Sequence, residues 1–195
     1  MKILQVFDLF SLVHGGGTVD IVYKLSRALS QKGHEVTIYT SDFELDHNYV
    51  DSLAKVNVRL FHCQSYFAGF YIMLGMIGEA RKELKGFDII HLHCLRSFQN
   101  IVMHYYARKY GIPYVVDTHG SLPRKAAGET GLKWLLRWLF DGLFGSQILN
   151  DAARIITENE FGLGEYEAFG AKNRRIAVIP LFFPVEDFIH QPHYS

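Results

Sequence analysis

The chain has 195 residues, of which 49% are hydrophobic and 14% aromatic, which is enough to bury the core of one domain of ordinary size. Its 20 basic and 20 acidic residues balance, and this argues against nucleic acid as a partner, because phosphate neutralisation needs a basic surface. The two cysteines, Cys63 and Cys94, lie far apart, which suits a reducing compartment better than a disulfide-stapled secreted fold.

The amino terminus and the apolar runs give no sign of a signal peptide or a membrane span. The opening sequence MKILQVFD has too short an apolar stretch for a secretion signal, so we expect the protein to be cytoplasmic. The longest uncharged apolar run, 66–78, has 13 residues, and a helix of that length cannot cross a hydrocarbon core about 30 Å thick.

Short β-branched runs alternate with stretches of helical period, which is the pattern of a parallel sheet covered by helices on both faces. Strands are predicted at 3–7, 35–40, 57–61, 88–92, 114–117, 154–157 and 175–179. Helices are predicted at 18–32, 97–110 and 160–168, with Gly33 and Gly111 ending the first two, and 41–55 is predicted to be irregular. We therefore predict an α/β fold with a Rossmann-like parallel sheet of about seven strands.

The last residues have the composition of a linker. Three of the five prolines, Pro180, Pro184 and Pro192, lie there, and no closing helix or strand is predicted. We divide the chain into a Rossmann-like domain at 1–180 and a linker at 181–195. Since ligands of open parallel sheets bind beyond the carboxyl ends of the strands, such a linker would lead to a second domain that faces the site.

A glycine triplet lies between the first predicted strand and the first predicted helix, in the sequence His14-Gly15-Gly16-Gly17. Glycines let the backbone approach a ligand closely, and a helix N-terminus presents free N–H groups and a partial positive charge to a phosphate. The alternative is a βα turn that binds nothing.

Other glycine motifs fit the sequence less well. A P-loop needs Gly-Lys-Ser/Thr and a hydrolase oxyanion loop needs a partner Gly-x-Ser-x-Gly, and the sequence contains neither. A dinucleotide fingerprint requires a third glycine where Asp20 stands. That interpretation stays open as an alternative, with Asp42 as a candidate ribose acceptor.

Two histidine motifs follow predicted strands. His119, in Asp117-Thr118-His119-Gly120-Ser121, is placed to donate a hydrogen bond to a hydroxyl or to act as an acid or base; the alternative is a histidine that only caps loop carbonyls. His91 and His93 share a face by the two-residue strand period. With Cys94 nearby they suggest zinc, but no second ligand pair stands at a recognisable spacing, so we predict no metal.

In their order and spacing these segments resemble the N-terminal domain of the retaining glycosyltransferases of family 4, which have the GT-B architecture of two Rossmann-like domains facing across a cleft. The resemblance covers nearly the whole chain, through GGGTVDIVYKLSRALSQKGHEVTIYT, DIIHLH, IPYVVDTHG, ARIITENE and RIAVIP. One departure is LFFP after Ile179-Pro180, where the family commonly has Asn-Gly.

The resemblance implies an enzyme that transfers a sugar from a nucleotide-sugar donor to a saccharide or lipid-linked acceptor, with retention of configuration. It places Gly15, Gly16 and Gly17 near the donor phosphates and makes His119 the catalytic histidine beside the transferred sugar. The donor phosphate is expected to serve as the base, so no metal or other cofactor is expected. Electrostatic stabilisation of the departing nucleotide is then the main task.

In the GT-B plan the N-terminal half mostly recognises the acceptor. We predict acceptor contacts from Asp8, His14, Arg96 and Arg124. A C-terminal donor-binding domain is expected to be missing from this chain, so the chain alone is expected to be an incomplete, inactive half. Two other functions stay open: a Rossmann-type NAD-dependent oxidoreductase, and a non-catalytic module that binds carbohydrate or protein.

Residues 132–149 form a helical pattern that is mostly apolar. The narrow polar stripe consists of Lys133, Arg137 and Asp141, and two tryptophans, Trp134 and Trp138, lie beside it. Such a helix either packs deeply or meets an apolar partner, such as the inner face of a membrane. Because the balanced charge offers little attraction to anionic lipid, we expect burial against the sheet or a second domain, and keep peripheral membrane contact as the alternative.

Overall fold

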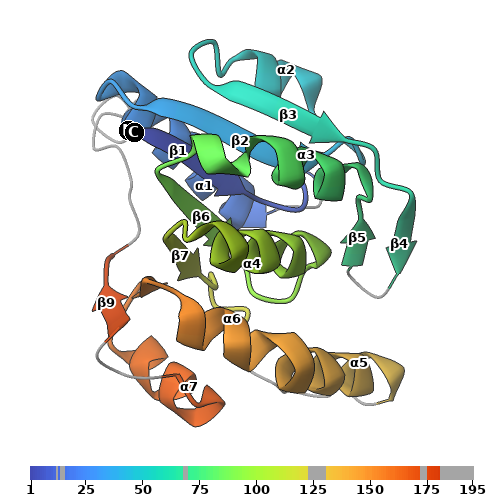
Figure 1. Ribbon diagram of the computed structural model, residues 1–195, viewed down its shortest axis with the longest axis vertical. Helices are drawn as coiled ribbons and strands as arrows, with labels where there is room; N and C mark the ends of the chain where they lie inside the picture. Colours follow the sequence, from blue (N-terminus) through green and yellow to red (C-terminus); the bar gives the residue numbers. More distant parts are fainter. Residues whose placement is uncertain (12, 14–15, 68–69, 123–130, 172–174, 181–195) are drawn as a thin grey trace, which may run out of the picture.

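The computed structural model describes residues 1–11, 13, 16–67, 70–122, 131–171 and 175–180, and shows a seven-stranded, all-parallel sheet in the order β3-β2-β1-β6-β7-β8-β9 (Figure 1). The strands are β1 (Lys2–Val6), β2 (Glu35–Ser41), β3 (Asn57–Phe61), β6 (Ile89–His93), β7 (Tyr114–Asp117), β8 (Arg154–Thr157) and β9 (Ile176–Val178). The predicted fold class is confirmed, and each predicted strand is found within two residues of its expected ends.

Helices cover both faces of this sheet. On one face lie α1 (Gly16–Gln31) and the short α2 (His47–Asp51), which pack on a core cluster that includes Val19, Val22 and Ile38. On the other face lie α3 (Gly75–Glu83), α4 (Phe98–Tyr110) and α6 (Ser146–Asp151) (Figure 1). The remaining elements are α5 (Leu132–Phe140), α7 (Phe161–Phe169), a 3-10 turn (Leu84–Gly86) and a π-helical turn (Asp141–Gly145) that joins α5 to α6.

Two predicted helix ends are confirmed by their backbone geometry. Gly33 and Gly111 have φ angles of 86° and 69°, the left-handed conformation in which glycine, lacking Cβ, is little strained. At the other end of α4, the Ser97 side chain accepts the backbone N–H of Asn100 and caps the helix. These caps set where the chain leaves each helix for the next strand.

Two regions differ from the prediction. Within 41–55, predicted irregular, Asp46 caps α2 by accepting the N–H of Tyr49, and the Tyr49 ring stacks on Tyr23 of α1 at 4.1 Å between centroids. The apolar run at 66–78, for which no element was predicted, overlaps an antiparallel hairpin of β4 (Ser65–Phe67) and β5 (Phe70–Ile72) and the start of α3. The stacking of Tyr49 on Tyr23 joins segments distant in sequence, which local patterns do not encode, whereas the hairpin pairs neighbouring residues.

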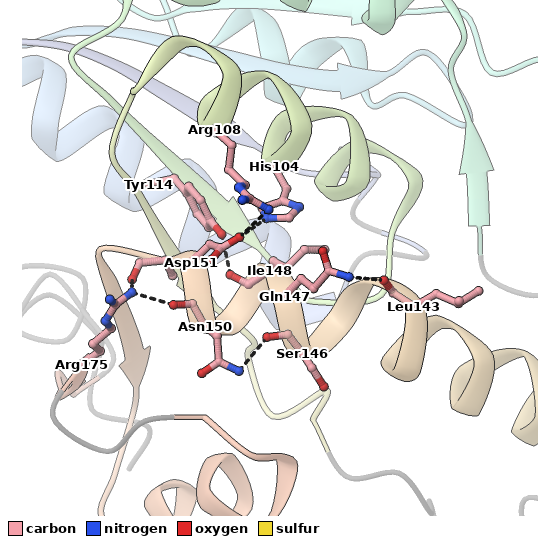
Figure 2. Close-up of polar contacts among 11 residues, drawn as sticks. His104, Arg108, Tyr114, Leu143, Ser146, Gln147, Ile148, Asn150, Asp151 and Arg175 are labelled. Carbon is pink, nitrogen blue, oxygen red and sulfur yellow. Dashed lines mark hydrogen bonds and ion pairs between the residues drawn. The ribbon is translucent and has the colours of Figure 1, made fainter.

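Helix α6 is held by polar contacts with three neighbouring segments (Figure 2). Asp151 at its end pairs with His104 and Arg108 of α4, at 2.9 and 3.2 Å. Tyr114 of β7 donates its hydroxyl to the Ile148 carbonyl, and Arg175 donates to carbonyls at the carboxyl end of the helix. Since those carbonyls lack partners inside the helix, Arg175 serves as a C-terminal cap.

A buried ion pair joins three segments beyond the carboxyl ends of the strands. The Arg96 Nε lies 2.8 Å from Asp141 Oδ1, and the same guanidinium donates to the carbonyls of Ser121 and Leu122. The two charged side chains are only 8% and 1% exposed. Arg96 therefore ties the segment after β6 to the segment after β7 and to the π-helical turn.

Helix α5 corrects one expectation. Among the residues of this helix whose burial is described, only Phe140 is buried, against Phe70 of β5, and most apolar side chains face solvent. The exposed ones are Leu132, Trp134, Leu135, Trp138 and Leu139, with Leu143 and Phe144 in the following turn. The expected burial against the sheet is wrong for these side chains, and the expected burial against a second domain stays a prediction. Among the described residues, no helix combines the length and apolarity needed to span a bilayer.

The Arg96–Asp141 pair yields a stability prediction. Arg96→Met is expected to lower the free energy of unfolding by about 3 kcal/mol or more, because a buried carboxylate loses its guanidinium partner. Arg108→Met, at a pair whose arginine is 59% exposed, is expected to cost about 1 kcal/mol or less. Urea unfolding of both variants checks this, and equal losses would contradict the structural role of Arg96.

Candidate functional site

Strands β1, β6, β7 and β8 run parallel and adjacent, so their carboxyl ends meet at one edge of the sheet. The last residues of three of these strands are His93, Asp117 and Thr157, and β1 places Gln5 beside His91 in the register. The strand period therefore brings Gln5, His91, His93 and Asp117 to one face at this edge. The predicted shared face of His91 and His93 is confirmed, since their ring centroids lie 4.0 Å apart.

The backbone turns sharply where two of these strands end. Cys94 has a φ of 61° and His119 a φ of 47°, values that side chains other than glycine rarely adopt, and Gly120 continues the left-handed turn at 70°. The Cys94 N–H donates to the Asp117 carbonyl over 2.8 Å, which fixes the two strand ends to each other. Residues held in this conformation cluster at functional sites, because surrounding structure must maintain them.

A cavity of about 210 Å³ opens beyond β7 and β8. Its lining comes from the strand ends, the two loops that follow them, and the first turns of α7: Asp117, Thr118, His119, Gly120, Ile156, Thr157, Glu158, Asn159, Phe161, Gly162, Glu165 and Tyr166. The predicted catalytic residue, His119, lies in this lining. The cavity is the natural place for a small polar ligand at this sheet edge.

His119 is held by protein groups on both sides of its ring. Its Nε2 lies 2.8 Å from Nδ1 of His93, and Nε2 of His93 lies 2.6 Å from the Gln5 amide oxygen. Its Nδ1 lies 3.4 Å from Asp117 Oδ1 and 3.5 Å from Glu158 Oε1. Those two separations are longer than a normal hydrogen bond, and Nδ1 has no hydrogen-bond partner among the described residues.

Burial sets the protonation of the neighbouring groups. It lowers the pKa of His91 to about 3, with help from the charge of His119, and it lowers the pKa of His93 well below the usual value. Both rings are therefore neutral near pH 7. Burial also raises the pKa of Asp117, against the opposing attraction of His119. The two neutral imidazoles lie behind His119, and Asp117 in the cavity lining holds its proton more tightly than usual.

Asp117, His119 and Glu158 also form the group of described residues whose ligand atoms lie within 4.8 Å of one another, close enough to surround a cation. Carboxylates and imidazole are common ligands of divalent metals. Acidic groups also gather in this way without a bound ion. The expectation that no metal takes part stays a prediction.

Tyr166 of α7 closes one wall of the cavity. Its hydroxyl donates to the Ile156 carbonyl over 2.8 Å, so it accepts from Thr118 Oγ1, also at 2.8 Å. Burial raises the pKa of this phenol to about 12, which keeps it protonated and able to donate. Helix α7 is thereby anchored to the loop that carries His119.

The predicted phosphate-binding glycines lie at the start of α1. Gly16 begins the helix with a φ of 56°, and at both Gly16 and Gly17 a Cβ would have no neighbour within 4 Å. The amino end of the helix is therefore open to close approach. His14 and Gly15 lie outside the described residues, so the geometry of the whole motif stays a prediction.

The predicted acceptor contacts have separate environments. Asp8 follows β1 at the same sheet edge, and its backbone carbonyl accepts the Ser41 hydroxyl over 2.7 Å. Arg96 is buried in its ion pair with Asp141, so contact with an acceptor would require that pair to open. Arg124 lies outside the described residues. Of the two that are described, Asp8 and Arg96, neither has a hydrogen bond or ion pair with His119, and the acceptor roles stay predictions.

Sequence reasoning did not single out Gln5 or Glu158. Gln5 lies inside the first predicted strand. A polar residue in an otherwise apolar strand indicates that its side chain has a hydrogen-bond partner in the interior. Glu158 stands directly after β8 in the segment ARIITENE, the position that faces a ligand in parallel sheets. The signal in each case was a polar residue at a strand position that the topology brings to the same edge.

Solved structures share this architecture. HepE from Anabaena, crystallised with UDP and glucose, is 14% identical with a TM-score of 0.68, and the match covers 95% of this chain and 46% of HepE. MurG from Acinetobacter baumannii is 12% identical with a TM-score of 0.54, covering 98% of this chain and 50% of MurG. A UDP-GlcNAc 2-epimerase from Methanocaldococcus jannaschii is 15% identical with a TM-score of 0.58, covering 92% and 45%.

These likenesses define the class: the fold is that of a Rossmann-like half of a GT-B protein, and the chain spans about half the length of the structures it matches. The family follows from the sequence, because the model of Glycosyltransferase Family 4 matches residues 15–187. The chain belongs to Glycosyltransferase Family 4. Comparison with curated proteins finds no significant match, and neither the family nor the solved structures support the oxidoreductase alternative.

Asp8 gives a pH prediction. Burial raises its pKa from 3.8 to about 6, against hydrogen bonds from the N–H groups of Asp8 and Leu9. Its contribution to stability is therefore fully present below about pH 4 and is lost as the pH rises through about 6. Asp8→Asn removes this titration, so the stability of the variant relative to the wild type should grow by about 1 kcal/mol between pH 5 and pH 7. Urea unfolding at both pH values checks this; a constant difference would show that Asp8 titrates normally.

Proposed function

We propose that this chain is the acceptor-side half of a retaining glycosyltransferase that uses a nucleotide-sugar donor. One observation carries the proposal. The cavity lined by His119 lies at the same sheet edge as the carboxyl end of β1, and from there the chain leads to the glycines at the start of α1. Family membership supports the transfer of a sugar. The crystallised complex of HepE with UDP-glucose supports a nucleotide sugar as the donor class.

In this proposal each part of the site has one task. The open amino end of α1, with Gly16 and Gly17, receives the donor phosphates through backbone N–H groups and the helix dipole. His119 lies beside the transferred sugar, and the leaving phosphate serves as the base. The chemistry needs no metal or other cofactor from this half.

The other half of the site is assigned to a second domain. We assign residues 1–180 to the acceptor-side domain and 181–195 to the linker, as expected from the sequence. The second domain would hold the nucleotide, so the chain alone is expected to be inactive. The acceptor is a saccharide or a lipid-linked saccharide that enters from the loops after the early strands.

The glycines allow a sharp test of donor binding. Gly17→Ala adds one methyl group where the protein has open space, so stability should hold or rise. In the longest native product of the gene, the KM for a nucleotide sugar is expected to rise tenfold or more, roughly what one methyl group is worth in a close-fitting site. Gly78→Ala in α3, also in open space, is the matched control and should leave KM unchanged.

The assay itself decides the function. A panel of nucleotide sugars should be consumed with transfer to a saccharide, and NMR of the product should show the anomeric configuration of the donor. His119→Ala should abolish turnover, while His47→Ala, at an exposed position in α2, should not. If no nucleotide sugar is bound or consumed, the transferase proposal fails and a non-catalytic binding module takes its place.

The exposed face of α5 favours a lipid-linked acceptor and a place at the inner face of the membrane. Trp134 and Trp138 are 38% and 54% exposed, and tryptophan prefers the interface between headgroups and acyl chains. The charge of the chain is balanced, so the apolar face would supply the binding energy. A protein of the cytoplasm would then meet its acceptor at the bilayer surface.

Vesicle sedimentation tests this contact. The chain is expected to sediment with phosphatidylcholine vesicles whether or not phosphatidylglycerol is added, because its net charge is zero. Trp138→Glu should lower the bound fraction on the order of tenfold. Tyr105→Glu, at a 58% exposed aromatic residue of α4, is the matched control. Equal binding by both variants would assign the α5 face to another partner, such as the second domain.

A further inference from the structure

The strongest unassigned feature is the line of polar groups behind His119. Gln5, His93 and His119 come from three different segments, and Gln5 and His93 are 88 residues apart. His93 is fully buried, and each of its two ring nitrogens takes part in one hydrogen bond. Removing a polar side chain from water costs free energy that its hydrogen bonds must offset. At a position that serves packing alone, an apolar side chain would avoid this cost.

The direction of each hydrogen bond follows from the partners. The Gln5 Oε1 can only accept, so the 2.6 Å contact places a proton on Nε2 of His93. Because burial keeps the His93 ring neutral, that is its single proton, and its Nδ1 can only accept. The 2.8 Å contact with His119 therefore uses the Nε2–H of His119 as the donor.

We propose that Gln5 and His93 are positioning residues for His119: they hold a proton on its Nε2 and leave Nδ1 as the nitrogen that meets a ligand in the cavity. The His119 side chain is only 3% exposed, and its Nδ1 has no hydrogen-bond partner among the described residues. Of the two carboxylates near Nδ1, Glu158 is more exposed than Asp117, at 26% against 11%. Glu158 is the group that moves aside when a donor sugar or phosphate approaches Nδ1.

His91 provides a matched comparison within the same cluster. It is buried on the same face, and its ring lies 4.0 Å from that of His93. Its Nε2, however, has no hydrogen-bond partner among the described residues. His91 therefore contributes packing, whereas His93 contributes packing and a directed hydrogen bond.

The first test uses the chain as it is, without substrate. Two-bond ¹H–¹⁵N NMR of the imidazole nitrogens at neutral pH should show His93 protonated on Nε2 alone and His119 protonated on Nε2. The reverse pattern, with His93 protonated on Nδ1 and donating to His119, would correspond to a Gln5 amide turned by half a rotation. That result would overturn the proposal. This readout does not depend on sugar transfer, so it stands or falls separately from the proposed function.

The second test rests on the proposed transferase activity and uses the longest native product of the gene. His93→Leu should lower kcat by about 10- to 100-fold, the range for loss of an orienting hydrogen bond, with the KM for the donor changed much less. His93→Asn keeps an acceptor near the position of Nδ1 and should recover part of that loss. His91→Leu should leave kcat within about twofold, since no directed bond is lost. If His91→Leu and His93→Leu reduce kcat equally, or if His93→Asn recovers nothing, His93 is only a packing residue and the proposal fails.

Discussion

The parallel arrangement of β1, β6, β7 and β8 decides which side chains can meet in this protein, because it brings the ends of all four strands to one edge. The register Gln5–His91 between β1 and β6 then places Gln5 within reach of His93, and the register His93–Asp117 between β6 and β7 places the two strand ends together. A shift of one residue in either register would turn the polar groups to the opposite face, into the apolar core under α4. The cavity and the histidines behind it depend on that register.

The loops at this edge are held by interactions that involve no ligand. Arg96 joins the segments after β6 and β7 to the turn before α6, and Tyr166 joins α7 to Thr118. Each interaction is buried, so it is strong relative to a similar contact at the surface. The site is therefore built before any ligand arrives, which lowers the ordering cost that binding must overcome.

Elements that depend on local chemistry could be predicted from the sequence, and those that depend on contacts between distant segments could not. The strands were predictable from β-branched runs, the ends of α1 and α4 from Gly33 and Gly111, and the shared face of His91 and His93 from the strand period. The helix at α2 was not, because its stability comes from the stacking of Tyr49 on Tyr23. His119 was expected at this sheet edge and lines the cavity there, whereas Gln5 was not singled out, because its partner is fixed only by the pairing of β1 with β6. Burial of α5 against the sheet was predicted wrongly, since an amphipathic pattern does not state what the apolar face meets.

The left-handed backbone at Cys94 and His119 has a cost of its own, of about 1 kcal/mol or more at each position. Glycine would relieve that strain at either strand end, yet at His119 it would remove the ring that lines the cavity. The most stable sequence for this turn is thus different from the one the site requires. The protein therefore keeps a backbone strain at the sheet edge that carries the candidate site. A screen for thermostability would favour glycine at position 119, and such variants would lose the imidazole.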